Sequence, residues 1–234
     1  MNLAQSLADA GLDWIVPQWN GPANVRAFFT TRNDAGDVRA FVPSGPVRLV
    51  QVHGCDVARV DPRDAAALRA APPRADAAVT QGQDVVLTVR TADCLPMLFA
   101  DRGGTTVAVA HAGWRGLAAG VLEATIAAMP VRARDVVGWI GPAIGPRAFE
   151  VGRDVFDAYC VADPGASSHF APLREGKWLA DLPALARRRL AAVGVVDVDG
   201  GLWCTHTQAD RFHSYRRDRA GGRMALVAWL ASRQ

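Results

Sequence analysis

Three side chains that bind transition metals well occupy similar places in the sequence. His53 lies near the end of "VRLVQVHG", Cys94 lies within "RTADCLPMLFAD", and His111 follows the apolar run "VAVA". Each stands where a short apolar run breaks next to a Gly or a Pro, which predicts a position at the end of a strand. Because the ends of neighbouring strands can converge on one rim of a sheet, where binding sites often form, we expect the three side chains to meet.

The types and the spacing of these residues favour a catalytic metal centre. Two imidazoles and one thiolate are good ligands for zinc, or for copper. Structural zinc sites usually take ligands in close pairs such as C-x2-C, whereas these residues lie 41 and 17 positions apart and meet only when the chain folds. Three protein ligands leave a fourth coordination position open for water or substrate, which is the catalytic pattern.

Two alternatives compete with this interpretation. Each of the three residues taken alone can be an ordinary core side chain, because free cysteine is often buried. A second group of potential ligands also occurs in "CTHTQADRFH", where Cys204 and His206 share a face of an expected strand and His213 lies nearby. The residues alone favour the first trio only modestly over this second group.

Arginine side chains could hold an anionic substrate beside such a centre, because a guanidinium recognises phosphate through paired donors. Arg115 lies four residues after His111 and stands at the expected start of a helix, whose amino end also favours anions. Arg216 and Arg217 lie in "FHSYRRDRAGGR", the densest basic cluster of the chain. For each arginine, a solvated charged turn is an equally good interpretation, and Arg115 is favoured because it is close to a metal ligand.

Two further residues are candidates because of their neighbours in sequence. Asp93 precedes Cys94 and could orient a ligand histidine or accept a proton. Trp114 could stack on a ring-shaped substrate, although a tryptophan beside a glycine is more often a packing anchor.

The elements that must position these residues alternate along the chain. Strands are expected at 47–52, 85–89, 105–110, 136–140 and 195–198, and helices at 117–129, 154–159 and 183–193. The stretch 61–78 is rich in Ala and interrupted by two Pro, which indicates a surface excursion. The interleaved pattern predicts a single α/β domain over residues 1–234, with a mixed sheet or sheets flanked by helices.

Composition limits the class of protein. The 234 residues are 50% hydrophobic and 21% charged, with a formal charge of +3, which suits a globular fold and speaks against a nucleic-acid platform. No signal peptide and no membrane span are expected, since no apolar run approaches about 18 residues. Four cysteines without a close pair indicate free thiols in a reducing cytoplasm, so we expect a cytoplasmic protein.

The motifs "QVHG", "TADCLPMLFAD", "HAGWRGLAAGV", "GPAIGP..FEVG" and "SYRRD" occur in an order that resembles the laccase-domain (YfiH-type) family, from about Phe28 to Trp229. This family was once described as multicopper polyphenol oxidase and is now associated with purine nucleoside phosphorylase activity. By this resemblance, His53, Cys94 and His111 match the metal-binding and catalytic residues of the family.

The resemblance implies a metal-dependent purine nucleoside phosphorylase acting on adenosine, inosine and methylthioadenosine, with adenosine deaminase activity. It implies zinc, or copper, as cofactor, and a nucleoside and phosphate as the small-molecule partners. Because a guanidinium recognises phosphate, Arg115 and Arg216 are the candidate substrate-binding residues for this activity. The family's fold also resembles a bacterial toxin's cysteine deamidase domain. Relatives commonly carry a cysteine after "GPAIGP", where this chain has Arg147 and Ala148, which weakens a claim of cysteine-rich copper chemistry.

Other functions remain open at this point. Cys94 could act without metal as a nucleophile with His111 as its base, acting on an amide. The resemblance implies peptidoglycan precursors as the substrate of such an amide hydrolase, because some relatives have been linked to their editing. Polyphenol oxidation is less favoured, because one trio is too small for a multicopper cluster. A metal-stabilised interaction domain without catalysis is a third alternative, and the open coordination position speaks against it.

Overall fold

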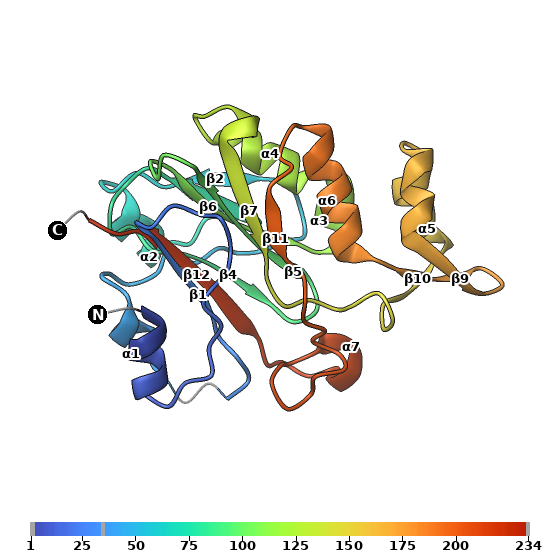
Figure 1. The fold of residues 1–234 in the computed structure, drawn as a ribbon, viewed down its shortest axis with the longest axis horizontal. Helices are drawn as coiled ribbons and strands as arrows, with labels where there is room; N and C mark the ends of the chain where they lie inside the picture. Colours follow the sequence, from blue (N-terminus) through green and yellow to red (C-terminus); the bar gives the residue numbers. More distant parts are fainter. Residues whose placement is uncertain (1–2, 34–35, 233–234) are drawn as a thin grey trace.

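Two β-sheets packed face to face form the centre of the molecule, and helices cover the outer face of the larger sheet (Figure 1). The computed structural model describes residues 3–33 and 36–232. The larger sheet has the strand order β11-β7-β5-β6-β3-β2. Its strands are β2 (Val57–Arg59), β3 (Ala77–Thr80), β5 (Leu95–Asp101), β6 (Val107–Ala112), β7 (Val136–Ile140) and β11 (Val198–Gly200). The sheet is mixed, because the two outer pairs are parallel and the central pairs are antiparallel.

The smaller sheet is antiparallel and has the order β1-β12-β4. Its strands are β1 (Val25–Phe29), β4 (Leu87–Thr91) and β12 (Met224–Leu230). The short helix α1 (Leu3–Asp9) lies against its outer face, where Leu7, Phe28 and Trp229 share one buried cluster. The last strand of the chain therefore lies between two strands from its first half.

Burial on both faces explains the sequence of the central strands. All seven residues of β5 are buried. Met97 and Phe99 belong to the core beneath the helices, whereas Leu98 and Ala100 belong to the core between the sheets. A strand with two buried faces reads as a continuous apolar run instead of an alternating one.

The helix layer consists of α3 (Trp114–Ala119), α4 (Val121–Ala128) and α6 (Leu182–Ala192). Helix α6 begins at a capping residue, since the carboxylate of Asp181 accepts a hydrogen bond from the amide of Ala184, and Pro183 occupies the first turn. A third, small sheet with the order β8-β10-β9 extends to the right in Figure 1 beside α5. Its elements are β8 (Glu150–Gly152), α5 (Arg153–Cys160), β9 (Phe170–Arg174) and β10 (Lys177–Ala180).

The remaining elements are short and lie in the connections. They are the helices α2 (Ala65–Ala70) and α7 (Tyr215–Asp218) and the 3-10 turns Val38–Phe41, Ala133–Asp135 and Pro164–His169.

The predicted fold class is confirmed: the chain is a single-domain α/β protein with mixed sheets and flanking helices. The strand predicted at 136–140 coincides with β7, and the helices predicted at 154–159 and 183–193 match α5 and α6 within one residue at each end. The predicted strands at 85–89, 105–110 and 195–198 are found two or three residues further along, as β4, β6 and β11.

Two predicted elements were wrong. The strand expected at 47–52 is an extended loop with isolated bridges at Val47 and Val50. The single helix expected at 117–129 starts earlier and is broken at Gly120, whose φ of +99° is a left-handed conformation that ends α3 before α4 begins.

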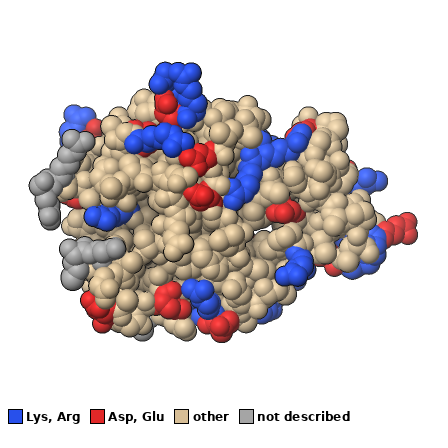
Figure 2. All heavy atoms as spheres, in the orientation of Figure 1, with Lys and Arg blue, Asp and Glu red and all other residues tan. Residues whose placement is uncertain are grey.

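Charges are mixed on the face shown in Figure 2, where acidic side chains lie among the basic ones. Basic side chains gather over α6, and two of its three arginines form ion pairs, Arg188 with Asp163 and Arg189 with Glu123. Among the described residues, none of the helices has the length and apolarity needed to cross a membrane.

Candidate metal centre and its cavity

The structure brings His53, Cys94 and His111 together. One nitrogen from each imidazole and the Cys94 sulfur all lie within 4.8 Å of one another. The Cys94 Sγ is 3.9 Å from the His53 Nε2, and the two imidazole rings stand nearly perpendicular with their centroids 4.8 Å apart. In the part of the chain that the structure describes, this is the one group of three His, Cys, Asp or Glu side chains that could hold an ion.

The elements that carry the trio differ from the three strand ends expected. His111 is the penultimate residue of β6 and pairs with Pro96 of β5, so Cys94, in the turn that enters β5, lies beside it. His53 lies in a loop and has a φ of +62°, a left-handed conformation that is uncommon for residues other than glycine. The sheet therefore positions two residues of the trio, and a loop in a left-handed conformation positions the third.

Asp76 is the residue beside the trio that sequence reasoning missed. Its carboxylate is fully buried and accepts a hydrogen bond from the Nδ1 of His111 at 2.8 Å. The same carboxylate accepts the backbone amides of Val52, His53 and Gly54. It therefore holds the left-handed His53 loop and fixes the His111 ring with Nε2 free for a ligand, as carboxylates do for metal-binding histidines.

The trio is also coupled electrostatically. Burial raises the pKa of the Cys94 thiol, but hydrogen bonds and charges from the two histidines outweigh it and bring this pKa down to about 7. Burial lowers the pKa of His111, but its bonds to Asp76 and Cys94 outweigh that effect and raise the pKa to about 9. The arrangement therefore favours a thiolate, which is the form of cysteine that binds metals and acts as a nucleophile.

Two glycines of "HAGWRG" allow the trio to pack. A Cβ on Gly113 would lie 2.9 Å from both the Cys94 sulfur and a ring carbon of His53. A Cβ on Gly116, in α3, would lie 2.8 Å from the backbone oxygen of Gly54 in the His53 loop. Both distances are too short for any side chain. The two glycines of this motif therefore leave the space that the trio and the His53 loop occupy.

The prediction that Asp93 orients a histidine of the trio was wrong. Its carboxylate accepts hydrogen bonds from the hydroxyls of Thr205 and Ser214 and from the amide of Arg216, and no histidine bond is among its contacts in the described chain. These bonds tie the turn before Cys94 to α7 near the end of the chain. Asp93 is therefore a structural link between two segments that border the site.

A cavity of about 590 Å³ opens beside the trio. Arg115, in the first turn of α3, lines it, and its guanidinium lies 4.4 Å from the centre of the Trp114 ring. Tyr215 of α7 is half-exposed at the same cavity, with the guanidinium of Arg223 5.7 Å from its ring centre. The full lining is Leu49, Gln51, His53, Arg90, Thr91, Ala92, Cys94, His111, Arg115, Tyr215 and Arg223.

The other basic candidates lie elsewhere. The Arg216 guanidinium donates to the backbone oxygen of Glu150 and lies over the ring of Phe149, and Arg216 is not among the residues that line the cavity. The Arg217 guanidinium donates to the backbone oxygens of Thr205, His206 and Phe212. Both arginines thus bind backbone.

The alternative metal group does not assemble among the described residues. Cys204 and His206 are present, but the Cys204 sulfur accepts the backbone amide of Gly145 at 3.2 Å, and no metal-binding cluster forms there.

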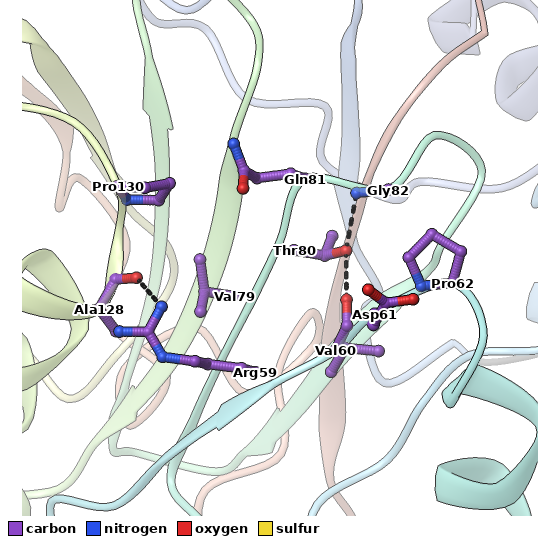
Figure 3. Close-up of a pocket in the computed structure, with 10 residues that line it drawn as sticks. All are labelled: Arg59, Val60, Asp61, Pro62, Val79, Thr80, Gln81, Gly82, Ala128 and Pro130. Atoms are coloured by element: carbon purple, nitrogen blue, oxygen red, sulfur yellow. Dashed lines mark hydrogen bonds between the residues drawn. The ribbon is translucent and has the colours of Figure 1, made fainter.

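A separate cavity of about 300 Å³ lies at the far end of β3 (Figure 3). Its polar side chains bind neighbouring backbone: Arg59 donates to the oxygen of Ala128, and the Thr80 hydroxyl lies between the oxygen of Val60 and the amide of Gly82. Metal-ligand types are scarce in this lining, where Asp61 is the one His, Cys, Asp or Glu.

Residues 23–231 match the model of the family described as multi-copper polyphenol oxidoreductase laccase. The chain belongs to this family. This family member is 44% identical to a Pseudomonas aeruginosa protein named purine nucleoside phosphorylase, over 93% of this chain and 98% of the relative. It is also 44% identical to purine nucleoside phosphorylase YfiH of Escherichia coli, over 92% and 98% of the two chains. A crystal structure of a Neisseria meningitidis protein superposes with a TM-score of 0.85 at 43% identity, covering 94% of this chain and all of that one.

Proposed function

We propose that the chain, taken as one domain over residues 1–234, is a metal-dependent purine nucleoside phosphorylase. Its substrates are adenosine, inosine and methylthioadenosine, and it also deaminates adenosine. The observation that carries the proposal is the trio of His53, Cys94 and His111 at the wall of a cavity that also holds Arg115. The names of relatives 44% identical over nearly the whole chain support the same activity.

The donor set fits a zinc ion. Cys94 is held toward its thiolate form, and the bond from Asp76 to the Nδ1 of His111 leaves the other ring nitrogen available. A zinc ion held by three protein ligands supplies Lewis acidity at its open coordination position. Copper would accept the same ligands, but a single trio suits one ion better than a multicopper cluster, which makes polyphenol oxidation the less favoured alternative.

Arg115 has the position of a phosphate-binding residue. In phosphorolysis, a phosphate oxygen bonds to the anomeric carbon as the bond to the purine nitrogen breaks. Arg115 lines the cavity beside the trio, and its paired donors suit a phosphate. Arg216 was also a candidate, but its backbone contact at Glu150 supports a structural role instead. The four cysteines are all free, which supports a reducing compartment such as the cytoplasm.

Product analysis of adenosine incubated with and without phosphate tests this proposal. We expect adenine, hypoxanthine and ribose 1-phosphate only when phosphate is present, because the inosine formed by deamination is then cleaved as well. Without phosphate, inosine should be the one product. Arg115→Ala is expected to lower phosphorolysis by about 10- to 150-fold, the loss of one charge-assisted contact, and deamination much less. Arg63→Ala is the control, because Arg63 is exposed and pairs with Asp61. Equal losses in both reactions would remove Arg115 from the phosphate site.

A second candidate is a metal-free amide hydrolase, and one observation favours it. Asp76, His111 and Cys94 lie in the order of an orienting carboxylate, a base and a nucleophile. Such an enzyme could edit peptidoglycan precursors.

The state of Cys94 separates the two candidates. A metal ligand is shielded, so iodoacetamide should modify Cys94 slowly in zinc-loaded protein and much faster after chelation. Cys94→Ser should lose zinc and nucleoside turnover together. If Cys94→Ser keeps its zinc yet is inactive, and wild-type Cys94 traps a covalent substrate adduct, the nucleophile candidate is correct.

A further inference from the structure

Thr91 is a buried threonine whose hydroxyl is left without a partner. It is the last residue of β4 and is 1% exposed, and its Oγ1 has no hydrogen-bond partner among the residues that the structure describes. Thr91 also lines the cavity beside the metal centre. A buried hydroxyl without a bond is costly to the folded state, and native proteins satisfy nearly all such groups.

Comparable threonines show that the fold can satisfy such hydroxyls. Thr88, on the same strand, donates from its hydroxyl to the backbone oxygen of Leu226 at 2.9 Å. Thr80, in the wall of the second cavity, is bonded on both sides (Figure 3). Thr106 also lacks a partner, but it is not among the residues that line the cavity at the trio. Of these four threonines, Thr91 is the one that both lacks a hydrogen-bond partner and lines the cavity at the trio.

The backbone around Thr91 is firmly held. Thr91 is in register with Met224 of β12, so the end of β4 is fixed by the smaller sheet. The neighbouring Arg90 exchanges two hydrogen bonds with the side chain of Gln51, one at its amide and one at its oxygen, both 2.8 Å. A ligand that meets this wall therefore meets a backbone already in place, and only the Thr91 side chain has to move.

We propose that the Thr91 hydroxyl binds a ribose hydroxyl of the nucleoside substrate. This inference rests on the proposed phosphorylase function. Because the hydroxyl oxygen is covered in the free protein, the contact requires a rotation about χ1 or a small outward shift as the ligand enters. A threonine hydroxyl both donates and accepts, as a sugar hydroxyl does.

The position of Thr91 favours a contact with the sugar of the substrate over a contact with the base or the phosphate. Thr91 ends β4, and Cys94 follows three residues later, in the turn that enters β5. Thr91 is therefore close to the trio. The atom that reacts in phosphorolysis is the anomeric carbon of the sugar. Phosphate has Arg115 as a charged partner, and the half-exposed ring of Tyr215 suits the flat purine base. The sugar is the remaining part, and it needs a neutral polar contact.

The stability of Thr91→Val tests whether the hydroxyl serves the fold. Valine has nearly the same shape and no hydroxyl, so we expect a melting temperature equal to or higher than that of the wild type. Thr88→Val is the matched control, and its melting temperature should fall because a satisfied bond is lost. A fall for Thr91→Val as large as that for Thr88→Val would overturn the inference, since the hydroxyl would then have a structural partner.

Selectivity among nucleosides tests the contact itself. For zinc-loaded wild type, kcat/KM is compared for inosine, 2′-deoxyinosine and 3′-deoxyinosine. We expect Thr91→Val to lose about 2- to 12-fold in kcat/KM for inosine, and to lose the preference over one of the deoxynucleosides. Thr91→Ser should restore the preference, and Thr88→Val should retain it.

The outcomes separate the two proposals. An active Thr91→Val enzyme that discriminates as the wild type does would overturn the role of Thr91 and leave the phosphorylase function standing. A zinc-loaded wild type that neither binds inosine in calorimetry nor cleaves it would overturn both. Zinc content is measured for every variant, and a loss of zinc in Thr91→Val would make Thr91 a support of the metal centre and also overturn the inference.

Discussion

The carboxylate of Asp76 positions two of the three residues of the trio. It bonds the His111 ring and three consecutive amides of the His53 loop, and the backbone oxygen of Asp76 accepts the amide of His111 as well. The left-handed His53 conformation persists because these bonds stabilise it. One side chain therefore links the loop that carries His53 to the strand that carries His111.

Asp76→Asn should weaken zinc binding by about 10- to 100-fold, because an amide can bond the histidine and the loop amides only in part. The measurement is competition with a chromophoric chelator at neutral pH. Asp101→Asn is the matched control, since the Asp101 carboxylate also accepts three backbone amides in a turn but contacts no histidine. An equal loss of zinc affinity in both variants would mean that Asp76 acts through general stability.

At the residue scale, sequence predicted the three side chains that meet and not the carboxylate that supports them. The type and the spacing of His53, Cys94 and His111 favoured this trio only modestly over the group at Cys204 and His206, and the motifs that resemble the family strengthened the choice. Asp76 lies in an alanine-rich stretch without a local signal, whereas Asp93 attracted attention as the neighbour of Cys94. The pairing of β3 with β6 places Asp76 beside His111. This contact joins segments that are far apart in sequence, so no local pattern indicates it.

At the element scale, the close contact between α3 and the His53 loop keeps the loop against the sheet. Gly116 faces the backbone oxygen of Gly54 at a distance that leaves no room for a methyl group. The contact fixes how far His53 lies from the strand that carries His111.

Gly116→Ala should lower zinc affinity, because the new methyl group moves the His53 loop away from α3. Helix propensity alone predicts that the same substitution raises the free energy of unfolding, by about 1 kcal/mol, because alanine favours a helix over glycine. Chelator competition and urea unfolding measure the two quantities. Gly221→Ala is the control, since its Cβ meets nothing within 4 Å. A more stable Gly116→Ala with unchanged zinc affinity would contradict the tight contact.

The bounds of a single element could be predicted from sequence where all of its residues are buried. Strand β7 has all five residues buried and was found at the predicted bounds. The run at 47–52 was wrongly predicted as a strand: Val47 is buried, but Val50 and Val52 are exposed, and Val47 and Val50 make only isolated bridges to other segments. A short apolar run does not tell a strand from an extended loop, since valines occur in both.

At the scale of the whole molecule, metal binding and protonation should compete. Zinc needs the thiolate of Cys94, whose pKa is lowered to about 7, and neutral His111, whose pKa is raised to about 9. Between about pH 7 and pH 9 the metal-free pair therefore holds one proton that zinc must displace. Below about pH 7 it holds two.

Stabilisation of the folded chain by a fixed excess of free zinc should therefore grow with pH. One displaced proton changes zinc affinity about tenfold per pH unit, so the gain in unfolding free energy should rise by about 1.4 kcal/mol between pH 7 and pH 8. Thermal unfolding with and without zinc at each pH measures it. His53→Ala should show a much smaller zinc effect. A zinc effect independent of pH would contradict the thiolate–imidazolium pair.

The central place of β12 in the smaller sheet has a consequence for biosynthesis. Val25 of β1 pairs with Leu230, so the two halves of this pair are made about 200 residues apart. At about 5–20 residues per second, β1 and β4 wait roughly 10 to 40 s and roughly 7 to 28 s, respectively, for the strand that joins them. During that time, Phe28 and Phe29, both fully buried in the finished protein, lack their covering strand. We expect the nascent chain to need protection from aggregation until β12 has been synthesised, and the cavity wall that holds Thr91 to form among the last parts of the molecule.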